Sequence, residues 1–177
     1  MNNPTVDPHA FTTPNSFTKN LYRDIYPAIE PTSPALSQEG KVVIITGASR
    51  GIGKLGFAAS FAKAHAKAIV ITARDVKSLR STKALIREIS PKTEVLPLPL
   101  EVTREESVKD MFEKVKLRFG GADMLVNNAA VNNTVGQQLS EADPKEWWGD
   151  VVSCANLRKG LFGNRAFMIF FGELVAD

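Results

Sequence analysis

A glycine-rich segment at residues 46–53 has the residue types and spacing best suited to chemistry. It reads Thr-Gly-Ala-Ser-Arg-Gly-Ile-Gly. Glycine lets a ligand approach the backbone closely because no Cβ intervenes, and N–H groups at the start of a helix bind phosphate. The spacing is not Gly-x-Gly-x-x-Gly, and Lys54 is followed by Leu55 rather than by the Ser or Thr of a Walker A loop. The segment therefore predicts a phosphate-binding turn of another kind.

Alternating strand and helix patterns surround this segment. Short apolar runs, rich in β-branched residues, predict strands at 42–45, 68–72, 94–100 and 123–127. Helical spacing of apolar residues follows each strand, for example at Ile52, Leu55, Ala59 and Ala62. Strands that alternate with helices imply parallel β-α-β units with right-handed crossovers. The expected fold is α/β, an incomplete Rossmann-type doubly wound parallel sheet of about four strands with flanking helices.

Several helix boundaries follow from capping residues. Asp75 and Asp143 are expected to cap the helices that follow them. Thr103 with Glu106 three residues later forms a capping-box pattern. Gly120 is expected to end the helix that this pattern opens. The strand at 94–100 is weakened by two prolines.

Length and composition are those of an ordinary globular protein. The sequence has 177 residues, 44% of them hydrophobic and 23% charged, and its single cysteine excludes a disulfide framework. No apolar run reaches the ~18 residues of a membrane span, and the first residues lack the pattern of a secretory signal. We therefore expect one domain, or one and a part, in a reducing cytoplasmic setting.

The two ends of the sequence differ from its middle. Six of the ten prolines fall before residue 35, so residues 1–38 are predicted to form an extended or disordered arm. Whether apolar residues of 17–30 dock this arm on the domain stays open. Residues 41–92 carry eleven Lys or Arg against two acids, a net charge of +9. That charge fits an anionic ligand, nucleic acid or solubility alone.

Four motifs in register resemble the short-chain dehydrogenase/reductase family. The glycine segment is similar to the cofactor fingerprint of that family. Asn-Asn-Ala-Ala at 127–130 resembles its Asn-Asn-Ala-Gly after the fourth strand, and Glu-Val-Thr at 101–103 resembles its Asp-Val-Thr after the third. Trp147-Trp148 with Asn-Leu-Arg-Lys-Gly at 156–160 resembles its Trp and Asn-Leu-Lys-Gly, with one residue more. The resemblance covers about residues 40–160.

This resemblance implies a dinucleotide site, residue by residue. The residues it assigns to the cofactor are Gly47, Ser49, Arg50, Gly51, Ile52, Gly53, Arg74, Glu101, Val102, Asn128, Ala129 and Ala130. The glycine segment would hold the pyrophosphate and lie near the adenosine ribose. Glu101 and Val102 would flank the adenine, and 128–130 would back the middle of the cofactor. Asn128 could instead only tie strands together.

The resemblance also implies a choice of cofactor. Family members that use NAD place an acidic residue at the end of the second strand, where Ala73 stands here. Arg74 and Arg50 could pair with a 2′-phosphate, which favours NADP, or could be solvated surface charges. Asp75 falls one residue too late to be the NAD acid, although NAD stays an alternative. His65 occupies a helix end where the family usually has Gly.

The family's catalytic Ser and Tyr-x-x-x-Lys have no counterpart at their expected places. Tyrosine occurs only at 22 and 26, before the glycine segment, and neither is followed by Lys four residues on. Asn156 matches the family's helix asparagine and is the one candidate catalytic residue. The sequence is therefore expected to be truncated before the catalytic residues, either naturally or through a misread gene.

The resemblance implies an NAD(P)-dependent oxidoreductase that moves hydride between nicotinamide and a carbonyl or alcohol carbon. The present chain is expected to bind NADP without catalysis. The alternatives are a non-catalytic dinucleotide- or partner-binding module and a non-functional fragment. Expected divisions are a proline-rich arm at 1–38, an NAD(P)-binding part at 39–160 and an unplaced apolar tail at 161–177. A second copy or a full-length relative could bind through the fourth helix or an exposed sheet edge, whereas nucleic acid, membrane and metal are not expected.

Overall fold

The computed structural model describes residues 17, 22, 24–131, 140, 141 and 143–150, and its centre is a parallel sheet. The strands are β1 (Val42–Ile45), β2 (Ala68–Ala73), β3 (Glu94–Pro99) and β4 (Met124–Val126). Their order is β3-β2-β1-β4, and all three pairings are parallel. The predicted Rossmann-type arrangement is confirmed, with strand bounds within one or two residues of those expected from the sequence.

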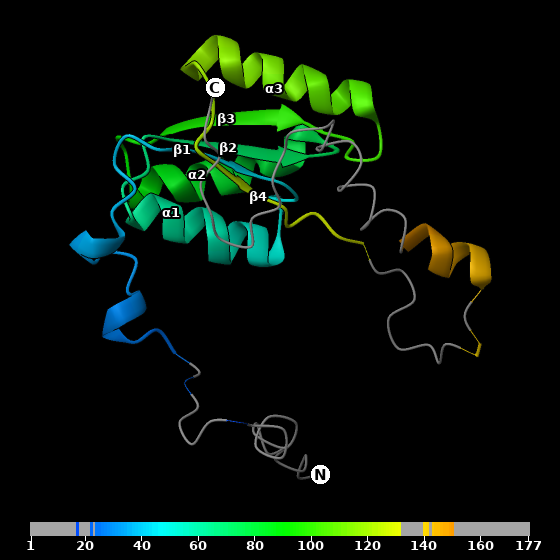
Figure 1. Cartoon of the computed structure of the whole chain (residues 1–177), viewed down its shortest axis with the longest axis horizontal. Coiled ribbons are helices and arrows are strands. Elements are labelled where there is room, and N and C mark those ends of the chain that lie inside the picture. The colour runs from blue at the N-terminus through cyan, green and yellow to red at the C-terminus, as the bar shows by residue number, and fades with distance from the viewer. Residues whose placement is uncertain (1–16, 18–21, 23, 132–139, 142, 151–177) are drawn as a thin grey trace.

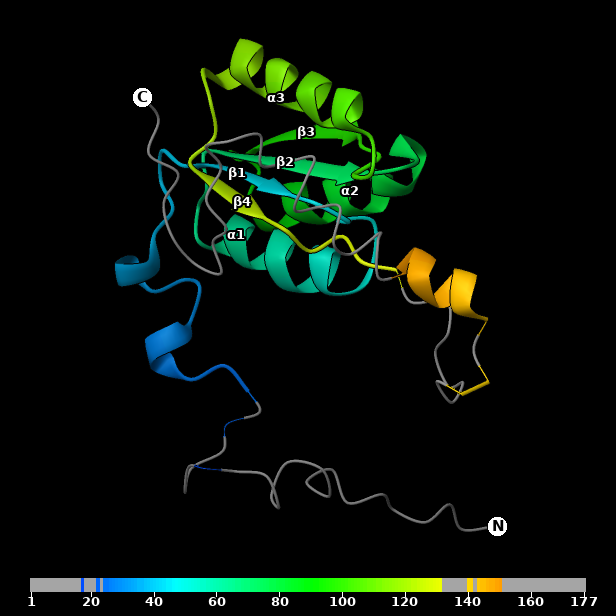
Figure 2. The same ribbon diagram turned by 45° about the vertical axis from the view of Figure 1, so that its right-hand side comes forward.

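Helices cover both faces of this sheet. They are η4 (Ile52–Ala58, a π-helix), α1 (Ala59–Lys63), η5 (Val76–Leu79), α2 (Arg80–Ile89) and α3 (Glu105–Phe119). Figure 1 and Figure 2 show α3 on one face of the sheet and both α1 and α2 on the opposite face. A further helical stretch occupies residues 144–150.

The two faces of the sheet carry separate apolar clusters. Side chains alternate along a strand, so Val42 and Ile44 belong to the cluster on the α3 face, whereas Val43 and Ile45 belong to the other. All four are buried, because β1 is a central strand that is covered on both faces. The helix residues of the two clusters are Val108, Met111 and Val115 on one face and Ala58, Ala62, Leu79 and Ile86 on the other.

The prolines of β3 are accommodated because this strand lies at an edge of the sheet. Glu94 donates its N–H to Lys67 and Leu100 donates its N–H to Ala73, so even-numbered residues face β2. The backbone nitrogens of the odd-numbered Pro97 and Pro99 are therefore directed away from β2, so their missing N–H groups remove no bond between the strands. The same prolines discourage another strand from adding at this edge.

Two of the expected helix caps are confirmed. The Asp75 carboxylate accepts the N–H of Lys77 at 2.9 Å, at the start of η5. The Asp143 carboxylate accepts the N–H groups of Lys145 at 2.7 Å and Glu146 at 3.2 Å. Each carboxylate satisfies donors that the first turn of a helix leaves without intrahelical partners.

The expected capping box is wrong. The cap residue of α3 is Arg104, which makes no side-chain capping bond. The Thr103 hydroxyl donates instead to the Glu101 carboxylate at 3.0 Å. Glu106 lies near the Arg104 guanidinium, at 3.7 Å. A nearby carboxylate therefore binds the hydroxyl that the capping pattern assigned to the helix.

The helix after the glycine segment also differs from its expected form. Ile52 and Leu55 are 71% and 68% exposed, whereas Ala58 and Ala62 are buried. The first part of this helix is the π-helix η4. Because a π-turn contains more residues than an α-turn, it changes which positions face the sheet. The apolar spacing predicted a helix correctly but not its buried side.

The N-terminal arm contains the short helices η2 (Pro27–Ile29) and η3 (Pro34–Leu36), each of which begins with a proline. Its large apolar residues that the structure describes are all exposed, namely Phe17, Tyr22, Ile25, Tyr26, Ile29 and Leu36, whereas Pro31 is buried. Figure 1 shows this part of the chain leading away from the sheet. Docking of these residues on the domain is therefore not observed.

Within the described ranges, no helix is long and apolar enough to cross a membrane. The tail at 161–177 and Asn156 lie outside these ranges, as does most of the arm before residue 24. The division at 1–38, 39–160 and 161–177 stays a prediction.

Candidate cofactor-binding site

A cavity of about 330 Å³ opens where the carboxyl ends of the four strands meet. From β1 the chain continues to β2 and then β3 on one side, whereas β4 pairs with the other side of β1. The cavity therefore lies at the point where the strand order reverses. Open α/β sheets bind ligands at such points. Its lining residues are Gly47, Ser49, Arg50, Gly51, Ile52, Thr72, Ala73, Arg74, Leu100, Glu101, Val102, Thr103, Asn128, Ala129, Ala130 and Val131.

The turn after β1 is shaped by close contact with the chain after β4. Gly47 has φ +66°, and a Cβ built on it would lie 2.7 Å from the Cα of Ala129. Both its conformation and its surroundings therefore require glycine. The next residue, Ala48, donates its N–H to Thr72 at 2.9 Å and accepts the Thr82 hydroxyl at 2.7 Å. These bonds hold the turn against β2 and α2.

The other two glycines of the segment have different surroundings. Gly53 is buried, and a Cβ on it would lie 2.5 Å from the Gly47 oxygen and 2.6 Å from Nδ2 of Asn128. Gly51 has φ +56°, and no atom lies within 4 Å of the position of its missing Cβ. Gly53 thus permits close packing beneath the turn, whereas Gly51 leaves an accessible backbone on the cavity side.

A hydrogen-bond network joins the ends of β1 and β4. The buried Thr46 hydroxyl donates to Val126 at 3.2 Å and accepts the N–H groups of Asn128 at 2.9 Å and Ala129 at 3.0 Å. The Asn128 amide donates to the carbonyls of Thr46 at 2.9 Å and Gly47 at 3.1 Å. Asn128 therefore fixes the glycine turn with its side chain as well as its backbone.

The end of β2 presents a cation to the cavity but no acid. β2 ends at Ala73, and Arg74 follows it, while Arg50 of the glycine turn also lines the cavity. Both arginines are exposed, and neither forms an ion pair with any described residue. Asp75 is absent from the lining, because its carboxylate caps η5.

The loop after β3 forms the remaining wall. Glu101 donates its N–H to the Ser107 hydroxyl at 3.0 Å. Its carboxylate accepts the Thr103 hydroxyl, so this side chain is bound within its own loop. The loop presents Leu100 and Val102 as apolar lining between these polar groups. An apolar wall with few polar groups is typical of small-molecule pockets.

One exposed ion pair on α3 has shifted pKa values. On α3 the Glu105 carboxylate accepts a hydrogen bond from the Lys109 ammonium at 2.7 Å. This contact lowers the pKa of Glu105 and raises the pKa of Lys109. Both side chains are exposed and lie outside the cavity, so they supply it with no proton donor.

The structure brings together eleven of the twelve cofactor residues implied by the resemblance. Gly53 alone does not line the cavity. The candidate catalytic residue, Asn156, lies outside the described residues. Lining residues that sequence reasoning missed are Thr72, Leu100, Thr103 and Val131. Each lies within two residues of a predicted cofactor residue, so the only signal available was its place near a strand end.

The fold and the site together define a Rossmann-type nucleotide-binding protein. The family model for short chain dehydrogenases matches residues 41–165. The chain therefore belongs to the short-chain dehydrogenase family, whose members bind a nicotinamide dinucleotide.

Named relatives agree with this membership. The chain is 40% identical over 156 residues to the short chain dehydrogenase pigC of Monascus ruber. The aligned region covers 85% of this chain and 49% of that protein. It is 37% identical to L-sorbose reductase from Gluconobacter frateurii, solved with NADPH and L-sorbose, over 71% of this chain and 47% of that one, with a TM-score of 0.57. It is 34% identical to 3-ketoacyl-(acyl-carrier-protein) reductase from Brucella melitensis, solved with NADH, over 70% and 50%, with a TM-score of 0.58. The chain thus spans about half the length of these relatives.

Proposed function

We propose that this chain binds NADP in the cavity at the carboxyl ends of its strands. It would be the cofactor-binding part of an oxidoreductase that moves hydride between nicotinamide and a carbonyl or alcohol carbon. One observation carries the proposal. The cavity is lined by the glycine turn, by the ends of all four strands and by two arginines that have no ion-pair partner among the described residues.

The choice of NADP over NAD rests on the end of β2. An NAD-binding protein of this type needs a carboxylate there to accept the ribose 2′-OH. Ala73 offers none, and the carboxylate of Asp75 is already bound to Lys77. Arg74 and Arg50 are the charged lining residues nearest this strand end and the glycine turn, and guanidinium groups bind phosphate in a bidentate manner.

The remaining lining residues suit the other parts of a dinucleotide. The turn at 47–52 offers backbone N–H groups beside open space at Gly51, which suits a pyrophosphate. Val102 and Leu100 offer an apolar wall for the adenine. Ala129 and Ala130 have small side chains that leave room behind the middle of the cofactor. The nicotinamide, when bound, would supply the hydride acceptor or donor.

We further propose that these 177 residues bind the cofactor without completing hydride transfer by themselves. The resemblance calls for a Tyr-x-x-x-Lys proton donor, yet tyrosine occurs only in the N-terminal arm. Tyr22 and Tyr26 contact each other there, with ring centroids 4.8 Å apart, and neither lines the cavity. A non-catalytic dinucleotide-binding module is accordingly the second candidate function.

A fluorescence titration with NADPH and NADH tests the binding proposal. The wild-type chain should bind NADPH at micromolar concentration and NADH at least tenfold more weakly, a difference of about 1.4 kcal/mol. Arg74→Ala should weaken NADPH binding about tenfold and leave NADH binding nearly unchanged. Arg87→Ala, an exposed arginine of α2 outside the cavity, is the matched control. Equal affinity for both cofactors would contradict the choice of NADP, and absence of any binding would contradict the site.

An assay of NADPH oxidation with a panel of carbonyl compounds tests the second part. We expect no turnover by this chain alone. Turnover that survives replacement of Tyr22 and Tyr26 by Phe and of Asn156 by Ala would show that other residues move the proton, and the proposed lack of catalysis would be wrong.

We also propose a cytoplasmic setting, in line with the single cysteine. The proposed protein partner is a second copy or a full-length relative, bound through the edge at β4 or the helix at 144–150. Light scattering of the purified chain, with and without such a relative, measures this association.

A further inference from the structure

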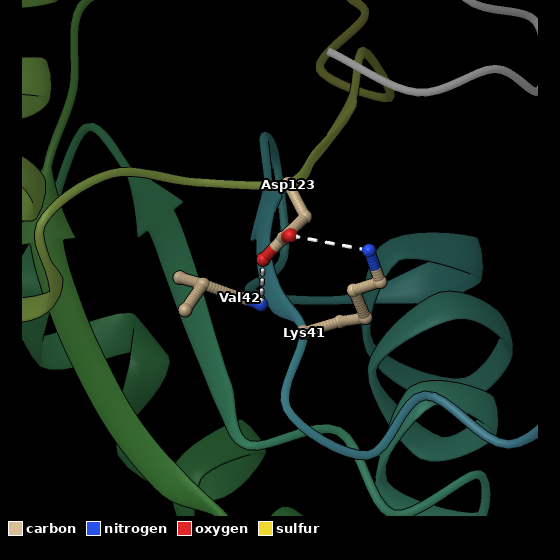
Figure 3. Close-up of polar contacts among 3 residues, drawn as sticks. All are labelled: Lys41, Val42 and Asp123. Carbon is tan, nitrogen blue, oxygen red and sulfur yellow. Dashed lines mark hydrogen bonds and ion pairs between the residues drawn. The ribbon is translucent and has the colours of Figure 1, made fainter. Parts of the chain in front are cut away.

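One side chain joins the amino end of β4 to the start of β1. Asp123 precedes β4, and its Oδ2 accepts the N–H of Val42 at 2.7 Å, while Oδ1 lies 3.3 Å from Nζ of Lys41. The backbone N–H of Asp123 also donates to the Val42 carbonyl at 2.9 Å. Figure 3 shows the carboxylate directed toward both side-chain and backbone donors. Three contacts thus hold Asp123 against Val42, the first residue of β1, and against Lys41, which precedes that strand.

The apolar pattern of β4 specifies its pairing register only weakly. This strand has three residues, Met124–Val126, and among the described strands it pairs with β1 alone. All three side chains are apolar and half-buried. A register slip would replace one apolar residue with another on each face of the sheet, so burial gives little discrimination. Polar contacts at the two ends of the strand must define the register.

The cavity depends on that register. In the observed pairing Ile45 lies opposite Val126, and Asn128 and Ala129 then meet the Thr46 hydroxyl. A slip of one residue moves a strand by ~3.3 Å. The backbone of Ala129 is already so close to Gly47 that a Cβ there would lie 2.7 Å from it. A slip would therefore either break the Thr46 contacts or force the turn and the β4 loop together.

We propose that Asp123 is a positioning residue for the cofactor site. By binding the Val42 N–H and the Lys41 ammonium, its carboxylate fixes the register in which Asn128 and Ala129 meet the glycine turn. Asp123 does not line the cavity and acts only through β4. The proposal rests on the proposed binding of NADP, which provides its affinity readout.

The test compares Asp123→Ala with Asp123→Asn in the full chain. The alanine variant should raise the dissociation constant for NADPH about tenfold, since a small displacement of binding groups has a large effect on a rigid site. It should also speed amide exchange selectively at Asn128 and Ala129. Asparagine retains an oxygen that accepts the Val42 N–H, so Asp123→Asn should restore most of the affinity and the protection. Val115→Ala is the control for general destabilisation, because Val115 is a buried residue of α3 that does not line the cavity and takes no part in the pairing of β4 with β1.

Lys41→Glu is a second variant, and it leaves both the Asp123 carboxylate and the Val42 N–H in place. It places a like charge beside the Asp123 carboxylate and should weaken NADPH binding several-fold, with the same two amides exchanging faster. The proposal is overturned if Asp123→Ala loses thermal stability, as Val115→Ala does, but keeps wild-type NADPH affinity and wild-type exchange at those two amides. Where Asp123→Ala does not fold, the same outcome in Lys41→Glu overturns it. If the wild-type chain binds no NADPH, the proposed function fails, but selective exchange at Asn128 and Ala129 still decides the role of Asp123.

Discussion

The floor and the rim of the cavity are built in different ways. The floor consists of the lining residues Gly47, Asn128 and Ala129 together with Thr46 and Gly53, which contact them from beneath. Its polar groups bind one another, and its glycines have no room for a Cβ. Every contact that shapes the floor is internal to the protein, so the fold determines it.

The rim consists of Arg50, Ala73 and Arg74. Its arginines are exposed and form no ion pair with described residues. No ion pair among the described residues accounts for the two arginines, which supports their proposed role in binding NADP. Changes in the floor should therefore alter both stability and binding, whereas changes in the rim should alter binding and selectivity alone.

Gly47→Ala should have the largest effect. The new Cβ would collide with Ala129 in a left-handed conformation, which should destabilise the fold by about 2–4 kcal/mol and abolish measurable NADPH binding. Gly121→Ala is the control, since open space surrounds that glycine and its φ is not positive. Urea unfolding and NADPH titration measure both variants. Wild-type affinity in Gly47→Ala would contradict the rigid floor.

Thr46→Val should have the next largest effect on stability. Valine keeps the shape of threonine but leaves the Ala129 N–H without its hydroxyl acceptor, which should cost about 1–3 kcal/mol. NADPH binding should weaken as well, because Asn128 and Ala129 line the cavity. Thr46→Ser retains the hydroxyl and should restore most of the stability in urea unfolding. If serine is no better than valine, the hydroxyl network does not hold the floor.

Ala73→Asp should change selectivity with little effect on stability. A carboxylate at the end of β2 would repel a 2′-phosphate and accept a ribose hydroxyl, so the NADPH to NADH preference should fall about tenfold or more. Ala73→Asn introduces a side chain of the same size without the charge and serves as the control. Titration with both cofactors gives the ratio. An unchanged ratio in Ala73→Asp would place the ribose somewhere other than at this strand end.

Asp75→Ala should have a smaller effect, confined to stability. Loss of the cap of η5 should destabilise the chain by about 1 kcal/mol, measured by urea unfolding. Asp75→Asn retains a capping oxygen and should lie close to wild type. The NADPH to NADH ratio should be unchanged in both variants. A selective loss of NADH binding would instead identify Asp75 as a ribose-binding acid and move it into the rim.

His65→Gly should have the smallest effect, and it should be favourable. His65 follows the end of α1 with φ 61°, a conformation that glycine adopts without strain. We expect a gain of about 0.5–1 kcal/mol in thermal unfolding, with no change in cofactor binding. His65→Ala keeps a Cβ and should give no such gain. An equal gain with alanine would attribute the effect to the imidazole rather than to the backbone.

Much of the fold could be predicted from local sequence because the evidence for it is local. β1 was predicted at its observed bounds, since a run of four β-branched residues is typical of a central parallel strand. Asp75 and Asp143 capped helices as expected because a cap needs only the next few N–H groups. Thr103 failed as a cap because Glu101 competes for its hydroxyl, and a spacing pattern does not weigh such competitors.

Only some features of the candidate site could be predicted from the sequence. The glycine segment was identified as a phosphate-binding turn, but its spacing could not separate the packing role of Gly53 from the open backbone of Gly51. The buried side of the following helix was missed, because the first part of this helix is a π-helix, whose turns contain more residues than the α-helical turns that the apolar spacing assumes. Asp123 lies 81 residues from Val42 along the chain, and no local pattern reveals that contact.

The sequence by itself determined that strands and helices alternate, that a glycine turn follows β1, and that arginine rather than an acid follows the end of β2. These properties depend on residue type and on neighbours within one turn or strand. Only the tertiary structure decided that β4 lies beside β1, that Asn128 supports the glycine turn and that Asp123 is positioned to set the register between the two strands. Such contacts join residues far apart in the chain, and they form only when the sheet brings the strand ends together.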